Sequence, residues 1–274
     1  PLLVAAERLG VGCAEMVRML VVEGKADVNQ ATLDRSSNPL YESVLSEDLE
    51  TARVLVEEGH ADVNLGTTDY AQSPLHIACI NGDIEMARML AVAGQADVNE
   101  VTSGCGDTPL HLAIAGGHTE IARILVVEFK ADTNIARAAD LDTPLHEAAV
   151  EGDAGLVHLL VVGGKAKIDQ RNEDGLRPLH VALMDGHRHT CFMLCALGAD
   201  RDLSMPEGLP SLVIGDQLLA VWIRVVGGYS CALEVALERR PTPRHRHAPA
   251  TKPADQQTHG PAGSREADPD RMHE

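Results

Sequence analysis

Aromatic residues are scarce in this sequence. Phe, Tyr and Trp together make up only 2% of the 274 residues, although apolar residues as a whole reach an ordinary 45%. A conventional globular core uses more aromatic side chains, whereas thin stacked helices pack mainly Ala, Leu, Ile and Val. The shortage therefore favours stacked helices over a single compact core.

Paired cysteines are also missing. The six cysteines contain no Cys-x-x-Cys pair and form no visible disulfide framework; they are Cys13, Cys79, Cys105, Cys191, Cys195 and Cys231. Reduced, mostly buried thiols are typical of the cytoplasm, or of the nucleus, where disulfides are rare. We therefore expect a cytoplasmic protein, with the nucleus as the alternative.

A membrane-spanning run is missing as well. The most apolar stretch, Leu209–Val226, is short for a span and is interrupted by Asp216, Gln217 and Arg224. No basic-then-apolar signal segment occurs at the start. We interpret the stretch as a buried helix and expect no contact with a membrane.

Basic residues are outnumbered, and the net charge is −18. Residues 241–274 carry five acids and five bases, so residues 1–240 hold 36 acids against 18 bases. Such a charge repels phosphate backbones and anionic lipid. The sequence therefore argues against nucleic-acid binding and favours a protein partner with a basic or neutral surface.

What the sequence does contain is a repeat. Pro-Leu dipeptides begin at residues 1, 39, 74, 109, 144 and 178, and the marker Ala-Asp-Val-Asn begins at residues 26, 61 and 96, with variants at 131, 166 and 199. Two independent markers keep a period of about 35 residues over five periods. Such a period indicates an array of supersecondary units.

One unit, residues 73–99, can be interpreted physically. Ser73 is expected to cap a short helix that starts at Pro74, and the Asn-Gly pair ending at Gly82 should terminate it. Asp83 should cap a second helix, which we expect Gly94 to end. A polar loop then leads to the next unit. Helices this short need neighbours, so stability must come from stacking.

The motifs resemble the ankyrin repeat family. Residues 108–113 and 143–148 match its signature Thr-Pro-Leu-His-x-Ala, and residues 73–78 and 177–182 match at every position but the first. The resemblance implies an all-α ankyrin-repeat solenoid over residues 1–203. Its six units would lie at about 1–29, 37–64, 73–99, 108–134, 143–169 and 177–202.

The sequence departs from the family pattern in three places. Most units have 35 residues against the usual 33. One extra residue precedes the Ala-Asp marker or its variant in every unit but the last, and the other lies in the hairpin-like loop. The first unit begins inside the signature, so we expect the chain to begin partway through a longer array. Residues 204–240 should form a divergent capping repeat or helical extension, and residues 241–274 a disordered tail.

Candidate catalytic and metal-binding residues do not form a coherent set. His76, His111, His146 and His180 recur at one repeat position, where the resemblance implies backbone hydrogen bonds that tie units together. The spacing of stacked helices, 8–10 Å, is too large for shared zinc ligation. His187 and Cys191 lack two further ligands. We therefore expect no enzyme activity, no metal and no cofactor.

A partner surface is expected where the units differ, because in ankyrin stacks the loop tips and first helices line a concave face. Tyr70 would be an aromatic anchor, and acidic residues would form a stripe for partner Lys or Arg. The candidate residues are Tyr70, Gln72, Ile80, Asn81, Asp107, Asp140, Asp142, Glu151, Glu173, Asp174, Met184 and Asp185.

These features favour a monomeric protein-interaction scaffold that is not an enzyme. The alternative is a regulatory or substrate-recognition segment of a larger enzyme or ubiquitin-ligase complex. The resemblance also implies possible asparagine hydroxylation, for which Asn29, Asn64 and Asn99 have the matching Asp-Val-Asn context.

Overall fold

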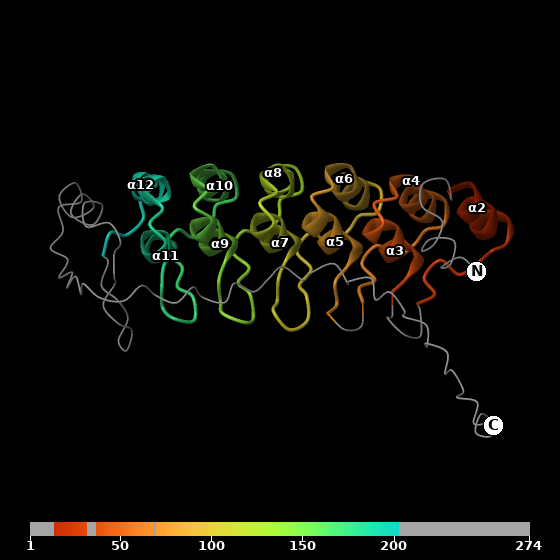
Figure 1. Ribbon diagram of the computed structural model, residues 1–274, viewed down its shortest axis with the longest axis horizontal. Helices are drawn as coiled ribbons and strands as arrows, with labels where there is room; N and C mark the ends of the chain where they lie inside the picture. Colours follow the sequence, from red (N-terminus) through yellow and green to blue (C-terminus); the bar gives the residue numbers. More distant parts are fainter. Residues whose placement is uncertain (1–13, 32–36, 68–69, 203–274) are drawn as a thin grey trace, which may run out of the picture.

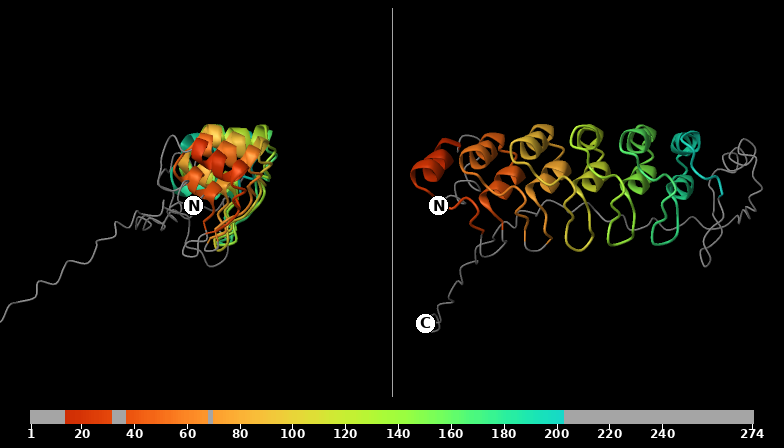
Figure 2. Two further views of the ribbon diagram at one scale, coloured as in Figure 1. Left: turned by 90° about the vertical axis from the view of Figure 1, so that its right-hand side faces the viewer. Right: turned by 180° about the vertical axis from the view of Figure 1, so that it is seen from behind.

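The computed structural model describes residues 14–31, 37–67 and 70–202. These residues form a straight stack of two-helix units with long loops on one side, and contain helices but no strand (Figure 1). In the view along the stack, the helices and loops of successive units nearly superpose (Figure 2). The predicted all-α solenoid is confirmed.

The helices lie in two rows (Figure 1). The inner row, next to the loops, contains α3 (Pro39–Leu45), α5 (Pro74–Asn81), α7 (Pro109–Ala115), α9 (Pro144–Glu151) and α11 (Pro178–Met184). The outer row contains α2 (Ala14–Arg18), α4 (Leu49–Arg53), α6 (Ile84–Val92), α8 (Thr119–Val127), α10 (Ala154–His158) and α12 (Arg188–Ala196). Three outer helices continue into π-helical turns, η1 (Met19–Glu23), η2 (Val54–Glu58) and η3 (Leu159–Gly163).

The inner helices begin as predicted. In α5, Ser73 has an extended backbone and Pro74 is the first helical residue, where its missing N–H leaves no hydrogen bond unmade. The Ser73 N–H donates to His76 Nδ1 at 3.1 Å. Gly82 ends the helix in the left-handed conformation, and Asp83 caps α6 by accepting from the Met86 N–H at 3.0 Å.

The extra residue of the 35-residue units is absorbed by a wider turn at the end of the outer helix. The Gly59 N–H donates to Val54 O at 3.0 Å, one residue further back than in an α-helix. In the first five units the residue before the Ala-Asp marker or its variant then has a positive φ, between 49° and 59°: Lys25, His60, Gln95, Lys130 and Lys165.

Gly94, expected to end the second helix of the unit at 73–99, lies just past its end, because α6 ends at Val92 with Ala93 as its C-cap. The left-handed residue that follows is Gln95, with φ 56°. Gly94 is needed for packing instead, since a Cβ there would lie 2.5 Å from Val63 Cγ1. In the last unit, which lacks the extra residue, Gly198 takes the left-handed conformation.

The core runs the length of the stack between the two rows. Leu75, Leu110 and Leu145 of the inner helices are completely buried, and so are Ala78 and Ala113, whose small side chains allow close helix approach. Burial of each leucine contributes about 1.5–3 kcal/mol relative to exposure. The apolar residues that recur in the sequence from unit to unit are therefore the residues that pack one unit against the next.

Asparagine side chains connect the loops that follow the outer helices. Asn64 Oδ1 accepts from the Asp97 N–H of the next unit at 2.8 Å, and its own N–H donates to Asp62 Oδ1 at 3.0 Å. The same bond between units recurs at Asn29–Asp62, Asn99–Asp132, Asn134–Lys167 and Asp169–Asp200. The last residue of each marker thus forms one hydrogen bond to the next unit, and together these bonds make a ladder along the stack, which we call the asparagine ladder.

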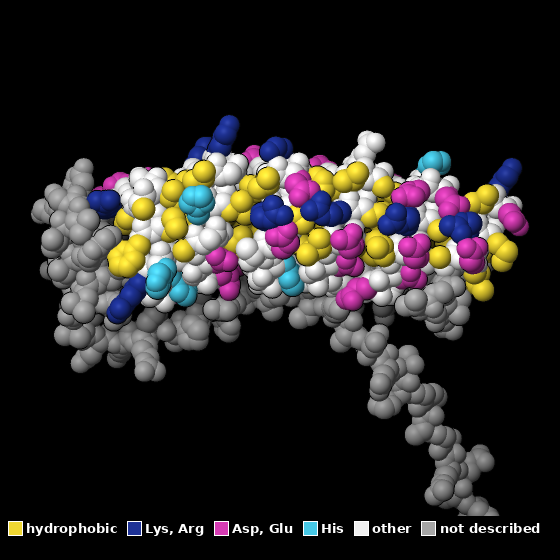
Figure 3. Space-filling view, turned by 90° about the horizontal axis from the view of Figure 1, so that it is seen from above, with side chains coloured by type: hydrophobic (Ala, Val, Ile, Leu, Met, Phe, Trp, Pro, Cys, Tyr) yellow, Lys and Arg dark blue, Asp and Glu magenta, His cyan; other side chains and the backbone are white. Residues whose placement is uncertain are grey.

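The outer face is covered by mixed charges. Figure 3 shows Lys or Arg and Asp or Glu side chains interspersed along it, with apolar side chains between them. Arg18 pairs with Glu58 of the next unit at 2.8 Å, and Arg88 pairs with Glu128. Exposed pairs of this kind contribute little stability, and the balanced charge makes this face a poor attractor for a charged partner.

Several sequence-based predictions lie outside the described residues. They are the start of the first unit, the capping repeat at 204–240 and the disordered tail at 241–274. Among the helices of the described part, none is long and apolar enough to cross a membrane.

Candidate protein-interaction site

The long loops below the inner helices are built alike. At the base of one loop the Thr102 N–H donates to Asp107 O at 2.9 Å, and at the base of the next the Arg137 N–H donates to Asp142 O at 2.8 Å. Each loop therefore closes on itself like a short hairpin and projects a tip away from the helices (Figure 1).

Neighbouring loop tips are joined by backbone hydrogen bonds. The N–H of one loop donates to a carbonyl of the loop before it in three successive pairs: Ser103 to Tyr70 at 2.8 Å, Ala139 to Cys105 at 3.2 Å and Glu173 to Asp140 at 2.8 Å. The tips thus form a continuous, preorganised edge along the stack.

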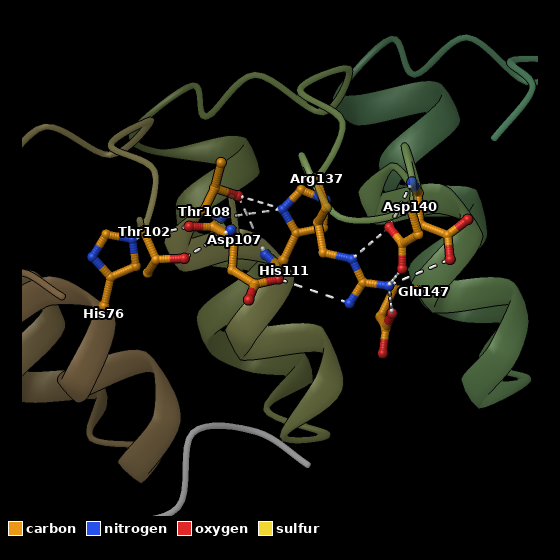
Figure 4. A network of polar contacts seen from close by, with 9 residues as sticks. His76, Thr102, Asp107, Thr108, His111, Arg137, Asp140 and Glu147 are labelled. Carbon is orange, nitrogen blue, oxygen red and sulfur yellow. Dashed lines mark hydrogen bonds and ion pairs between the residues drawn. The ribbon is translucent and has the colours of Figure 1, made fainter. Parts of the chain in front are cut away.

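Arg137 lies at the centre of a polar network on this side of the molecule (Figure 4). Its guanidinium group lies 2.8 Å from Asp140, 3.3 Å from Asp142, 3.4 Å from Glu147 and 3.7 Å from Asp107. The carboxylates come from two successive loops and from α9. One cation therefore links two loops to an inner helix.

Burial disfavours the charged form of Glu147, a carboxyl group of this network. It lies on α9 at a position where other inner helices carry the buried apolar residues Ile77, Leu112 and Val181. Burial raises the pKa of Glu147 to about 7, although the charge of Arg137 acts in the opposite direction. Near neutral pH this carboxyl is therefore divided between its two forms.

Two of the candidate contact residues, one acidic and one neutral, are buried in the structure. Asp142 is only 7% exposed, and its Oδ1 accepts from Asn172 Nδ2 at 2.8 Å, so it holds two loops together. Gln72 is 8% exposed and is equally unsuited to direct contact. Asp107 and Asp140 are partly exposed but pair with Arg137, which offsets part of their charge.

The remaining candidates do reach the surface. Tyr70 is 62% exposed at its loop tip. Glu173 and Asp174 are exposed at the tip of a later loop, and Glu151 and Asp185 are exposed where α9 and α11 end. The half-buried candidates Ile80, Asn81 and Met184 occupy the corresponding ends of α5 and α11.

Two of the four recurring histidines, His76 and His146, bind backbone of the following loop, as the resemblance implies, whereas Nε2 of His111 and of His180 is buried without a hydrogen-bond partner among the described residues. His76 Nδ1 accepts from the Ser73 N–H, so Nε2 carries the proton and donates to Glu100 O at 3.1 Å and Asp107 O at 3.2 Å. His146 Nε2 contacts Leu176 O at 3.1 Å in the same way. Burial lowers the pKa of His76 to about 4, which keeps the ring neutral.

A second set of histidines joins the inner-helix ends. His118 Nε2 contacts Ile80 O at 3.1 Å, and His187 Nε2 contacts Val150 O at 2.8 Å. The described residues contain no cluster of His, Cys, Asp or Glu that could hold a metal ion. His187 therefore has a structural contact, which weakens the case for ligation together with Cys191.

The candidate hydroxylation positions lie in the segments that lead from an outer helix into the next long loop. Asn29 and Asn64 are exposed and Asn99 is half-buried. The side-chain oxygen of each accepts a hydrogen bond in the ladder between units. Hydroxylation stays a prediction.

Sequence reasoning missed three residues that shape the site. Arg137, Glu147 and Asn172 organise the loops, yet each looks like an ordinary charged or polar residue on its own. A signal was present for Glu147, because a glutamate replaces an apolar residue at a core position of the repeat. Nothing local indicated that Arg137 would meet four carboxylates.

Comparison with known proteins agrees with this architecture. The family described as "Ankyrin repeats (3 copies)" matches residues 2–102 and 92–171, more than half of the chain. The chain belongs to the ankyrin repeat family. The crystal structure of the ankyrin repeat domain of Bcl-3 superposes on this ankyrin stack with a TM-score of 0.70, covering 82% of this chain and 97% of that one. At 24% identity, this likeness concerns the fold alone.

Two curated relatives share a shorter segment. Protein phosphatase 1 regulatory subunit 27 of Mus musculus and of Homo sapiens are each 48% identical to this ankyrin protein over 50 residues. The match covers 18% of this chain and 32% of the relatives, so this protein spans about a third of their length in the alignment.

Proposed function

We propose that this ankyrin stack is a non-catalytic scaffold that binds a protein partner with a basic surface. Its contact surface comprises the loop tips and the inner-helix ends of the last three described units. The family supports protein binding as the general role. The finer statement, which surface and which kind of partner, is supported by the exposed carboxylates described next.

The observation that carries the proposal is a group of exposed acids on the loop side, near the C-terminal end of the described stack. Glu173 and Asp174 at a loop tip and Glu151 and Asp185 at the inner-helix ends are all exposed. On the outer face, by contrast, acidic and basic side chains are interspersed (Figure 3). A net negative field on the loop side accelerates encounter with a positively charged protein and favours its binding.

Charge reversal tests this proposal. In the full chain, Glu173→Lys with Asp174→Lys should lower affinity for a captured partner at least tenfold at low salt, whereas Glu50→Lys with Glu85→Lys on the outer helices should leave it unchanged. Both pairs are exposed, so neither should alter the unfolding midpoint much. Equal effects of the two double variants would contradict the assignment of this surface.

A regulatory role is a second candidate, favoured by the match to protein phosphatase 1 regulatory subunit 27. On this hypothesis the stack would position an enzyme or its substrate and would not act chemically. Purified protein phosphatase 1 catalytic subunit is a direct probe. Saturable binding to the full chain would support the candidate, and no binding at low salt would remove this particular enzyme.

A further inference from the structure

Leu141 has an unusual backbone for a large apolar residue. Its φ is 58°, in the left-handed region that favours glycine. The equivalent turn position in the other described loops carries a small residue: Ala71 with φ 49°, Gly106 with φ 77° and Gly175 with φ 72°. The turn therefore requires a residue in the left-handed conformation. It does not require a leucine side chain.

The leucine side chain also gains little from folding. It is 48% exposed at the loop tip, although the Leu141 N–H donates to Arg137 O at 3.0 Å and fixes the backbone. A glycine would close the same turn with less strain and without exposing apolar surface. A residue that costs stability at an exposed tip is explained by a contact outside the chain.

The surroundings of Leu141 define that contact. Ala138 and Ala139 of the same loop are exposed, and Gly106 of the preceding loop permits the close approach of Ala138, because a Cβ on Gly106 would lie 2.5 Å from the Ala138 N. The three adjoining loop segments, 102–107, 137–142 and 172–175, contain five acids and one base. Arg137 pairs with three of these acids, and Arg171 donates to Gly175 O at 2.6 Å, so Glu173 and Asp174 carry most of the acidic charge that reaches the surface here. A small apolar spot thus sits inside an acidic rim.

We propose that Leu141 is the apolar anchor of the partner interface, covered by apolar side chains of a partner segment that also carries Lys or Arg. The apolar side chains bury Leu141, and the cations face Glu173 and its acidic neighbours. This inference rests on the proposed function and adds the chemistry of the partner: a basic, amphipathic segment. An all-polar basic segment would leave the leucine exposed.

The test uses the full chain and a displayed library of random peptides as the probe. The tightest selected peptides should combine Lys or Arg with apolar residues. Leu141→Gly should weaken their binding at least tenfold and should raise the unfolding midpoint by about 2–4 °C, because it relieves the left-handed strain. These opposite signs are not expected from a residue that only supports the fold.

Two further variants separate backbone from side chain. Ala71→Gly relaxes the equivalent turn of an earlier loop and should stabilise the protein without changing peptide affinity. Leu141→Asn keeps a residue that tolerates the left-handed region but removes the apolar side chain, so it should weaken binding as much as Leu141→Gly.

The outcomes distinguish this inference from the proposed function. If the Leu141 variants keep full affinity while Glu173→Lys with Asp174→Lys loses it, the acidic loop surface stands and the anchor is wrong. If neither set changes affinity, or if no selected peptide binds the loop side, both proposals fail. Selected peptides that lack Lys and Arg would overturn the partner chemistry.

Discussion

At the scale of single residues, Glu147 is a carboxyl group at a position that three other inner helices fill with apolar side chains and that α3 fills with a second glutamate, Glu42. The pKa of Glu147 is raised to about 7 by burial, with Arg137 acting against the shift. The unfolded chain has the ordinary value, near 4.5. Between these two values the folded state binds more protons than the unfolded state, so stability falls as the pH rises.

Glu147→Gln should remove this pH dependence. Relative to the variant, the wild-type protein should lose up to about 3 kcal/mol of unfolding free energy between pH 4.5 and pH 8, since one pKa unit corresponds to 1.36 kcal/mol. Denaturant unfolding of both proteins across this range measures the difference. A difference that stays constant with pH would show that folding does not shift the pKa of Glu147.

A second prediction at this scale concerns the stability cost of replacing Gly82. Its φ is 78°, and a Cβ there would collide with the ring of His118 from the next unit. The ring holds its place by a hydrogen bond to Ile80 O at 3.1 Å. Gly82→Ala should therefore cost about 2–4 kcal/mol, the left-handed penalty plus the displaced ring.

The matched control is Gly117, which has φ 71° and open space around the position of a Cβ. Gly117→Ala should cost only the backbone penalty, about 1–2 kcal/mol. Equal losses in the two variants would show that the His118 contact contributes nothing.

At the scale of elements, the helices follow closely from sequence. Thr143-Pro144 begins α9 and Gly152 ends it, because capping and glycine preferences are local properties. The two-helix unit and the repeat boundaries could therefore be predicted. The wide π-type turn at the end of the outer helix could not be predicted, because Gly94 looks like the residue that ends the helix. In the structure Gly94 packs closely against Val63, and the left-handed residue is the next one, Gln95.

The candidate site was predictable in outline but not in detail. Loop tips and inner-helix ends could be named from the repeat. The pairing of Arg137 with Asp107 and Glu147 depends on how adjacent loops stack, which is a relation between units. For the same reason Asp142 was predicted as a contact residue although it is buried.

The wide turns predict a stability gain. Lys165 is exposed and has φ 59°, so Lys165→Gly should raise the unfolding free energy by about 0.5–1 kcal/mol by relieving left-handed strain. Lys167, two residues on, has no positive φ. Lys167→Gly should instead lower stability slightly, because glycine gains entropy in the unfolded chain. Thermal unfolding of the two variants checks both signs.

At the scale of the whole molecule, the residues that hold the stack together and the residues proposed to bind a partner lie in different parts of each unit. The outer helices and the asparagine ladder repeat with little change, and they hold the units at a constant spacing. The loop tips differ from unit to unit and are joined to each other by backbone hydrogen bonds. A rigid edge of variable side chains suits protein binding, since little ordering entropy is lost on association.

The most direct measurement of the central claim is amide hydrogen exchange of the full chain with and without its tightest selected peptide. The account predicts slower exchange at the loop tips within 102–107, 137–142 and 172–175, and no change in the outer helices α6 and α8. Protection centred on the outer helices, or no protection at the loops under saturating peptide, would contradict it.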